Sequence, residues 1–170
     1  VRPFSIDDFL LPMRASLAEG PIVACEAAAI HAEALASGAD AEFDPRVRDR
    51  VRIGAGIPAA AYIRSLRTRA RLRAEMMQRM QDVDVLVLPT VAIPPPRFED
   101  VTDEAGFTRT NLLVLRNTAI ANYFDMPAIS LPLPGTALPV GLMLIGPTDG
   151  DDRLFDIAGA VEETTSVLRA

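Results

Sequence analysis

The sequence contains no lysine and no tryptophan, and it has one cysteine and one histidine. Without lysine, the chain itself cannot form a Schiff base, supply a P-loop lysine or use a catalytic lysine. The single Cys25 excludes an internal disulfide framework, and with His31 as the single histidine there is no zinc cluster. We therefore expect a reducing, cytoplasmic setting, with neither a metal nor any other cofactor.

Long apolar runs are also missing. No stretch approaches the roughly 20 apolar residues that a membrane helix needs, and the N-terminus lacks the basic-then-apolar order of a signal peptide. The first residue is Val1 rather than Met, which indicates that at least the start was processed or cut. The formal charge of −6 disfavours nucleic acid as a general partner. We expect neither a membrane nor a nucleic acid partner.

The remaining composition is that of an ordinary globular protein. Apolar residues make up 49% and charged residues 24% of the 170 residues, whereas aromatic residues are only 5%. The core must therefore be built from Ala, Val, Ile and Leu. A chain of this length has room for one domain or two small ones, and we expect a single unit over residues 1–170.

The first part of the chain, residues 1–82, has the signals of a mainly helical region. Pro21 and Pro45 suit first helical positions, Asp44 suits a helix N-cap, and Gly38 and Gly54 suit helix ends. These signals predict helices at Ile6–Leu11, Ile22–Ala36, Pro45–Ile53 and Ala59–Gln81.

Arginine is concentrated in this part of the chain. Residues 46–79 hold ten arginines against Asp49 and Glu75, a net charge of +8, and the rest of the chain carries −14. One interpretation is a phosphate-binding stripe along a helix. We favour a solvated helix face, because no aromatic residues or glycine-rich loop accompany the arginines.

The second part, residues 83–170, has the pattern strand, helix, hairpin, helix. The run VDVLVL has the length and composition of a buried strand, and residues 91–109 form a Pro-rich and then acidic connection. A short turn joins the next two strands, so we expect them to be antiparallel neighbours. The predicted elements are a strand at Val83–Leu88, a buried helix at Thr110–Phe124, strands at Ala128–Leu133 and Val140–Ile145, and a helix at Asp149–Leu168.

Four segments together resemble the C-terminal part of the amidase signature family. They are VRDRVRIGAGIPAAAYIRSLRTR, VDVLVLPT with its Pro-rich loop, RNTAIANYFDMPAISLPL and LPVGLMLIGP, in that order. The resemblance covers about Ala24 to Val167. It implies an α/β fold with a mixed sheet flanked by helices. It also implies an activity: members hydrolyse amides, or release ammonia from an amide as part of an amidotransferase, with a Ser-cisSer-Lys triad.

That triad is not in this sequence. There is no lysine, and the serines stand singly, at Ser5, Ser16, Ser37, Ser65, Ser130 and Ser166. An acyl-transfer site needs a nucleophile within reach of a base, together with oxyanion donors. The resemblance therefore implies roughly the final third of an amidase-like enzyme, without catalytic residues and inactive alone.

The resemblance also implies four substrate-binding candidates: Arg50, Leu115, Arg116 and Asn122. Arg50 matches an arginine that helps bind the substrate carboxylate in some glutamine-using members, although it is also one of a run of exposed arginines. The helix carrying Arg116 faces the pocket in relatives. Leu115 replaces the Asp that glutamine-using subunits carry seven residues before the Asn corresponding to Asn122, which makes glutamine a less suitable substrate. Asn122 also suits a purely structural role at a helix end.

Two other residues are interpreted as core. Cys25 lies on an Ala-rich segment, where a buried, inert thiol is expected. Met143 stands where many relatives carry Gln, and we interpret it as core filling.

Three functional hypotheses follow. The leading one is a C-terminal fragment of an amidase-family hydrolase, whose full-length parent cleaves the C–N bond of a small-molecule amide. The second is a fragment similar to the amidase-like subunit of a glutamine-dependent amidotransferase. The third is a non-catalytic assembly module. In each case the expected partner is the missing N-terminal catalytic part or a second copy of the chain.

Overall fold

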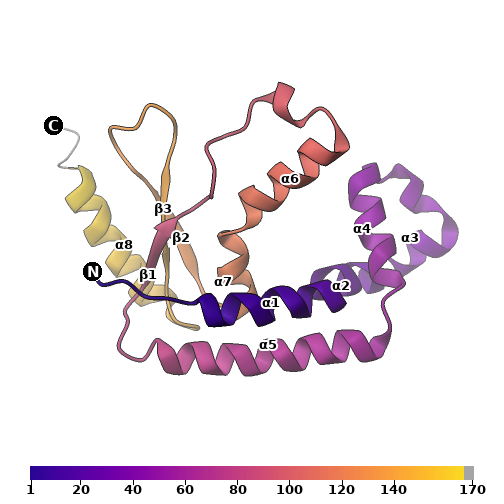
Figure 1. Cartoon of the computed structure of the whole chain (residues 1–170), viewed down its shortest axis with the longest axis horizontal. Helices are drawn as coiled ribbons and strands as arrows, with labels where there is room; N and C mark the ends of the chain where they lie inside the picture. The colour runs from indigo at the N-terminus through magenta and orange to yellow at the C-terminus, as the bar shows by residue number, and fades with distance from the viewer. Residues whose placement is uncertain (167–170) are drawn as a thin grey trace. The chain divides into compact units, whose positions relative to one another are not determined.

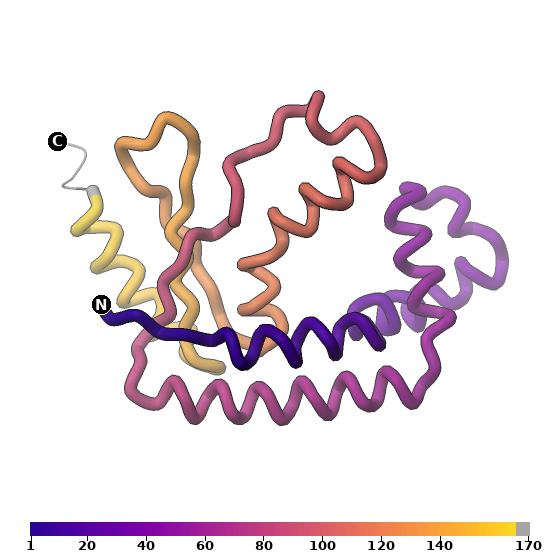
Figure 2. The backbone as a smooth tube through the Cα atoms, viewed as in Figure 1, coloured from indigo at the N-terminus to yellow at the C-terminus, as the bar shows by residue number. Residues whose placement is uncertain are grey.

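The computed structural model describes residues 1–166. The chain divides into two compact units, Val1–Ala74 and a second unit from Glu75 onward. Each unit is described by itself. Figure 1 labels their helices and strands, and Figure 2 traces the backbone through both.

The first unit is helical, as predicted. Asp44 caps α4, where its side chain accepts a hydrogen bond from the backbone N–H of Arg46 at 2.9 Å, and Pro45 takes the first helical position. Gly38 ends α3 with φ of +80°, a conformation that favours glycine. The elements are α1 (Asp7–Glu19), α2 (Ile22–Ile30), α3 (Ala32–Ser37), the 3₁₀ helix η1 (Ala39–Glu42), α4 (Pro45–Ala55) and α5 (Ala59–Arg79), whose last residues belong to the second unit.

Two predicted helices differ from the observed ones. The first was expected to end at Leu11, but α1 continues through Pro12 and buries Phe9 and Met13 on one side. Proline removes one helical hydrogen bond, and the packing of this apolar side offsets that loss. The predicted helix Ile22–Ala36 is interrupted at His31, whose ring contacts Phe43 edge-on with centroids 5.2 Å apart.

Close helix contacts hold the first unit together. α2 and α4 cross at Gly54, where any side chain would collide with the backbone of Ala24. α1 and α5 are tied by the buried Ser65 hydroxyl, which donates a hydrogen bond to the carbonyl of Ser16 at 3.0 Å. Small residues at these crossings let the backbones approach each other.

The second unit is built around a three-stranded sheet. Its strand order is β1-β3-β2, and both pairings are antiparallel, so β1 and β2 run in the same direction. The elements after the end of α5 are β1 (Leu86–Pro89), the 3₁₀ helix η2 (Phe98–Val101), α6 (Glu104–Leu115), α7 (Thr118–Phe124), β2 (Ala128–Pro132), β3 (Gly141–Ile145) and α8 (Asp151–Ser166).

Alternation along β3 places side chains on both faces of the sheet. Leu144 packs with Leu131 of β2 and with Leu154 and Ala158 of α8, so α8 covers this face. Met143 and Ile145 point to the other face and are also buried, as expected for Met143. In Figure 1, α8 and α7 lie on opposite sides of the strands. The α/β class, with helices flanking a sheet, is therefore confirmed.

The predicted hairpin of β2 and β3 is confirmed, but the predicted helix Thr110–Phe124 is wrong in two respects. The helix begins earlier, at Glu104, where the Asp103 side chain caps it, and it breaks at Arg116 and Asn117 into α6 and α7. It is also not buried all round, because Leu112 is 65% exposed. The expected end of the last helix, Leu168, lies outside the described residues. Within residues 1–166, no helix has the length and apolar character needed to cross a membrane.

Candidate functional site

A buried asparagine links the break between α6 and α7 to the end of β1. The Asn117 side chain is only 7% exposed, and its Nδ2 donates a hydrogen bond to the carbonyl oxygen of Pro89 at 2.7 Å. A buried amide needs such a partner, because leaving it unpaired costs about 1–3 kcal/mol. This tertiary hydrogen bond gives a physical reason for the helix break that the sequence pattern did not indicate.

The neighbouring Arg116 is joined to this link. Its Nε donates a hydrogen bond to Oδ1 of Asn117 at 3.2 Å, and the rest of its side chain is exposed. Arg116 was predicted as a binding residue from the family resemblance, whereas Asn117 was not among the predicted binding residues. The structure makes Asn117 the connection between Arg116 and the sheet.

A pair of hydroxyl groups lies beside this link. Thr90 directly follows Pro89, and its Oγ1 lies 2.5 Å from Oγ of Ser130 on β2. Both hydroxyls face Gly141 at the start of β3, where an added Cβ would lie 2.5 Å from each oxygen. We call Pro89, Thr90, Arg116, Asn117 and Ser130 the β1-end cluster.

Asn122 lies at the other end of the sheet. It lines an open polar cavity of about 300 Å³ next to the start of β2 and the end of β3, together with Ala121, Asp125, Met126, Pro127, Thr148, Asp149 and Asp151. The Thr148 hydroxyl donates a hydrogen bond to the Asp125 carbonyl at 2.9 Å. Arg116 precedes α7, whereas Asn122 lies near the end of that helix, and Arg116 is not among the residues that line the Asn122 cavity.

Leu115 is the last residue of α6, and its side chain is 47% exposed. Its carbonyl accepts a hydrogen bond from the Thr118 hydroxyl at 3.2 Å, which satisfies one of the carbonyls that a helix end leaves without a helical partner. Leu115 and Arg116 are thus adjacent at the helix break, with an apolar and a cationic side chain both reaching solvent.

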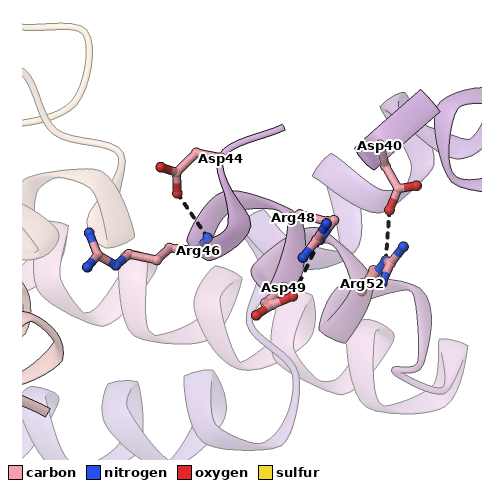
Figure 3. Close-up of polar contacts among 6 residues, drawn as sticks. All are labelled: Asp40, Asp44, Arg46, Arg48, Asp49 and Arg52. Atoms are coloured by element: carbon pink, nitrogen blue, oxygen red, sulfur yellow. Dashed lines mark hydrogen bonds and ion pairs between the residues drawn. The ribbon is translucent and has the colours of Figure 1, made fainter. Parts of the chain in front are cut away.

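Arg50 belongs to the first unit, on α4, and its side chain is exposed. The neighbouring arginines of α4 form the contacts drawn in Figure 3. Arg52 Nε lies 2.7 Å from Oδ2 of Asp40, a carboxylate that is only 1% exposed, and Arg48 Nε lies 3.8 Å from Oδ1 of Asp49. The arginines of this helix thus serve at least in part as structural ion-pair partners.

The first unit also has an open apolar cavity of about 670 Å³, lined mainly by small residues of α2, α3 and α4. At its edge the Tyr62 hydroxyl donates a hydrogen bond to Glu26 Oε1 at 3.1 Å. This hydrogen bond raises the pKa of Tyr62 above its ordinary value. Cys25 lines the same cavity and is half-buried, whereas the sequence predicted full burial.

The chemistry that the β1-end cluster can supply is hydrogen bonding and ion pairing. The β1-end cluster offers a guanidinium and two hydroxyl groups, and it includes no general base that would activate a serine or threonine. Among residues 1–166, no group of three or more His, Cys, Asp or Glu side chains is arranged to hold a metal ion.

Sequence reasoning overlooked the tether role of Asn117, the hydroxyl pair and the buried Asp40. A single signal was available for Asn117, because a polar residue inside an otherwise apolar run needs a partner. Thr90 follows β1 and Ser130 lies on β2, and these two strands are not paired with each other, so no local pattern connects the two residues.

The family model "Amidase" matches residues 8–155. A 2-amino-5-chloromuconic acid deaminase of Comamonas testosteroni is 38% identical over 122 residues, which is 71% of this chain and 26% of the relative. A subunit of the glutamyl-tRNA(Gln) amidotransferase of Thermus thermophilus is 35% identical over 140 residues, which is 79% of this chain and 29% of the relative.

Solved structures give the same result. A crystal structure described as an amidase matches 91% of this chain with a TM-score of 0.74 and 28% identity, and this match covers 36% of its own length. Allophanate hydrolase of Kluyveromyces lactis matches 88% of the chain with a TM-score of 0.72 and 25% identity. The chain thus spans about a quarter to a third of the length of these relatives. The sequence resemblance is confirmed, and the chain belongs to the Amidase family.

Proposed function

We propose that this chain is the C-terminal part of an amidase-family hydrolase that cleaves the C–N bond of small-molecule amides. The observation that carries the proposal is the family match over residues 8–155 in a sequence that has no lysine and no adjacent serines. In this proposal the Ser-cisSer-Lys groups come from residues outside this sequence, in a longer protein or in a second chain. The chain alone does not hydrolyse amides.

The contribution of this chain is substrate binding at the edge of the sheet. Arg116 and Leu115 present a cationic and an apolar side chain at the helix break, which Asn117 ties to Pro89, the residue before Thr90. Such a surface suits the part of an amide substrate that is not cleaved. Asn122 and Arg50 remain proposed binding residues that act at other places on the chain.

A surface for the rest of the enzyme is also present. Phe98 is 95% exposed and lies just before α6, and Leu112 and Leu115 are exposed on α6 itself. An open apolar groove of about 930 Å³ runs along this helix. Exposed apolar surface of this kind is typical of a protein–protein contact. These residues support a partner, either the preceding part of the family domain or a second chain.

The alternative function is that of a glutamine-dependent amidotransferase subunit. Relatives that are subunits of glutamyl-tRNA(Gln) amidotransferases are 30–35% identical to this chain. The apolar Leu115, at the position where the resemblance implies an Asp in glutamine-using subunits, favours the general amidase. A cytoplasmic location is also proposed, and the free thiol of Cys25 supports it.

The test compares the chain alone with a chimera. In the chimera, this chain replaces the matching C-terminal region of the Comamonas deaminase, and ammonia release from a panel of amides and from that enzyme's own substrate is measured. We expect no turnover by the purified chain and restored turnover by the chimera. The matched control is the deaminase without its C-terminal region, which should be inactive. Turnover by the chain alone, or a folded but inactive chimera, contradicts the proposal.

A further inference from the structure

Arg116 is the one cationic side chain of the β1-end cluster, and a buried tether fixes its position. We propose that Arg116 binds a carboxylate group of the substrate and that Asn117 is the positioning residue that orients it. The substrate class is then an amide that also carries a carboxylate. This inference rests on the proposed amidase function and deepens it.

The two hydrogen bonds of the Asn117 side chain fix the orientation of its amide. The Pro89 carbonyl can only accept a hydrogen bond, so the NH₂ group of Asn117 must face it. Oδ1 of Asn117 is then left to accept from Arg116 Nε, which is the hydrogen bond observed at 3.2 Å. The two hydrogen bonds require the same amide orientation, so each supports the other.

The hydrogen bond to Asn117 leaves the two terminal nitrogens of the Arg116 guanidinium available. Arginine has five N–H donors, and Asn117 uses the one on Nε. Within residues 1–166, this is the one side-chain hydrogen bond of Arg116, and no ion pair to a carboxylate is formed there. The two terminal nitrogens therefore keep a pair of parallel donors, the arrangement that binds a carboxylate through two hydrogen bonds.

Arg116 differs from several other arginines of the chain in the group that its side chain contacts. Arg52, Arg97 and Arg153 each contact a carboxylate of the same chain, which explains them without a ligand. Arg116 instead contacts a neutral amide that is itself anchored to the sheet. A guanidinium that is held in place, and that no carboxylate of the described chain neutralises, is suited to bind the carboxylate of a ligand. The name of the Comamonas relative describes its substrate as an acid, which agrees with this chemistry.

The experiment titrates the chain with succinamate, which has one amide and one carboxylate, and with butyramide, in which a methyl group replaces the carboxylate. The Nε–H resonances of ¹⁵N-arginine-labelled protein report binding, and because the chain has no lysine, arginines supply nearly all of its cationic side chains. We expect a saturable shift at Arg116 with succinamate and none with butyramide. Arg116→Gln should weaken succinamate binding at least about tenfold.

Two further variants separate the effect of the charge of Arg116 from the effect of its fixed position. Arg109→Gln removes the same charge from α6, and it should leave succinamate binding unchanged. Asn117→Ala keeps the charge of Arg116 but removes its anchor, and we expect succinamate binding to weaken about fivefold, with the Arg116 Nε–H resonance broadened. Weak, unsaturable shifts shared by all arginines, or equal effects of Arg109→Gln and Arg116→Gln, overturn the inference.

The chimera separates this inference from the proposed function. If the chimera hydrolyses succinamate and butyramide equally well, and Arg116→Gln changes neither, the inference fails and the amidase function stands. If the inference is correct, Arg116→Gln raises KM for succinamate more than it lowers kcat, and it lowers kcat/KM for succinamate more than kcat/KM for butyramide. A chimera that hydrolyses no amide contradicts the proposed function, and the titration of the chain still decides whether Arg116 binds carboxylates.

Discussion

Thr90 Oγ1 and Ser130 Oγ lie 2.5 Å apart, although β1, which ends one residue before Thr90, and β2, which holds Ser130, are separated by β3. Adjacent strands are about 4.8 Å apart, so two outer strands are roughly 10 Å apart across a central one. The hydroxyls meet over Gly141, the first residue of β3, because glycine has no side chain there. The hydrogen bond between these two hydroxyls thus depends on the absence of a side chain at Gly141 of the central strand.

Gly141→Ala should therefore destabilise the protein. The new Cβ would lie 2.5 Å from both hydroxyl oxygens and 3.0 Å from the Cβ of Thr90, so the pair must separate. Overpacking of this kind costs about 1–3 kcal/mol, which denaturant unfolding of the two proteins would measure.

Gly159→Ala provides the control for this substitution. Gly159 lies within α8, and an added Cβ would meet no atom within 4 Å. Alanine is favoured over glycine inside a helix by about 0.5–1 kcal/mol, so this change should stabilise the protein. Equal effects of the two substitutions would show that the space above Gly141 is not required.

Asn117→Ala is expected to destabilise the protein by about 1 kcal/mol, because the hydrogen bond from the buried Asn117 amide to the Pro89 carbonyl is lost. Asn111→Ala, on the neighbouring α6, serves as the comparison and should change the free energy of unfolding by less than about 0.5 kcal/mol. Urea unfolding of both variants measures the difference. A loss of similar size in both would contradict the assigned role of Asn117.

Arg52→Gln should cost about 2 kcal/mol of stability, because it removes the cationic partner of the buried Asp40 carboxylate. Asp49→Asn alters the nearby pair with Arg48, in which the Asp49 side chain is 68% exposed. Exposed pairs contribute little, so this change should cost less than about 0.5 kcal/mol. Thermal unfolding of the two variants tests the contrast, and a larger loss for Asp49→Asn contradicts it.

Tyr62 should keep its proton at higher pH than an ordinary tyrosine. The hydrogen bond to Glu26 raises its pKa above the value of about 10 found in unfolded chains. The hydrogen bond from the protonated Tyr62 hydroxyl therefore stabilises the folded state fully below about pH 10. This contribution is lost as the pH rises through the raised pKa of Tyr62. Phenolate absorbance in a Tyr123→Phe background reports Tyr62 alone, and Glu26→Gln should lower its titration midpoint.

Local signals predicted much of the fold. The start of α4 was predicted correctly from Asp44 and Pro45, and the end of α3 from Gly38. The antiparallel pairing of β2 with β3 was predicted correctly from the short turn between them. The errors occur where tertiary contacts override local preferences. α1 continues past Pro12 because Phe9 and Met13 pack on one side of it. The apolar pattern predicted one helix at Thr110–Phe124, whereas the structure has a break at Asn117, which forms a hydrogen bond to Pro89.

The site was predicted less completely than the fold. Arg116 was identified through the family resemblance, but its anchor depends on a contact between residues 28 positions apart in the chain. The hydroxyl pair joins Ser130 on β2 to a residue 40 positions earlier, just after β1, and these two strands are not adjacent. No local pattern contains such information, because it depends on the strand order β1-β3-β2.

That strand order has a consequence for how the site can change. Because β1 and β2 run in the same direction beside β3, the chain leaves both strands at the same edge of the sheet, where β3 begins. The segment after Pro89 and the connection from Leu133 to Val140 can therefore be lengthened or replaced without disturbing Leu131, Leu144 and Leu154 in the core. If the chain binds substrate as proposed, swapping these two loops between relatives should change the substrate preference and leave this core unchanged.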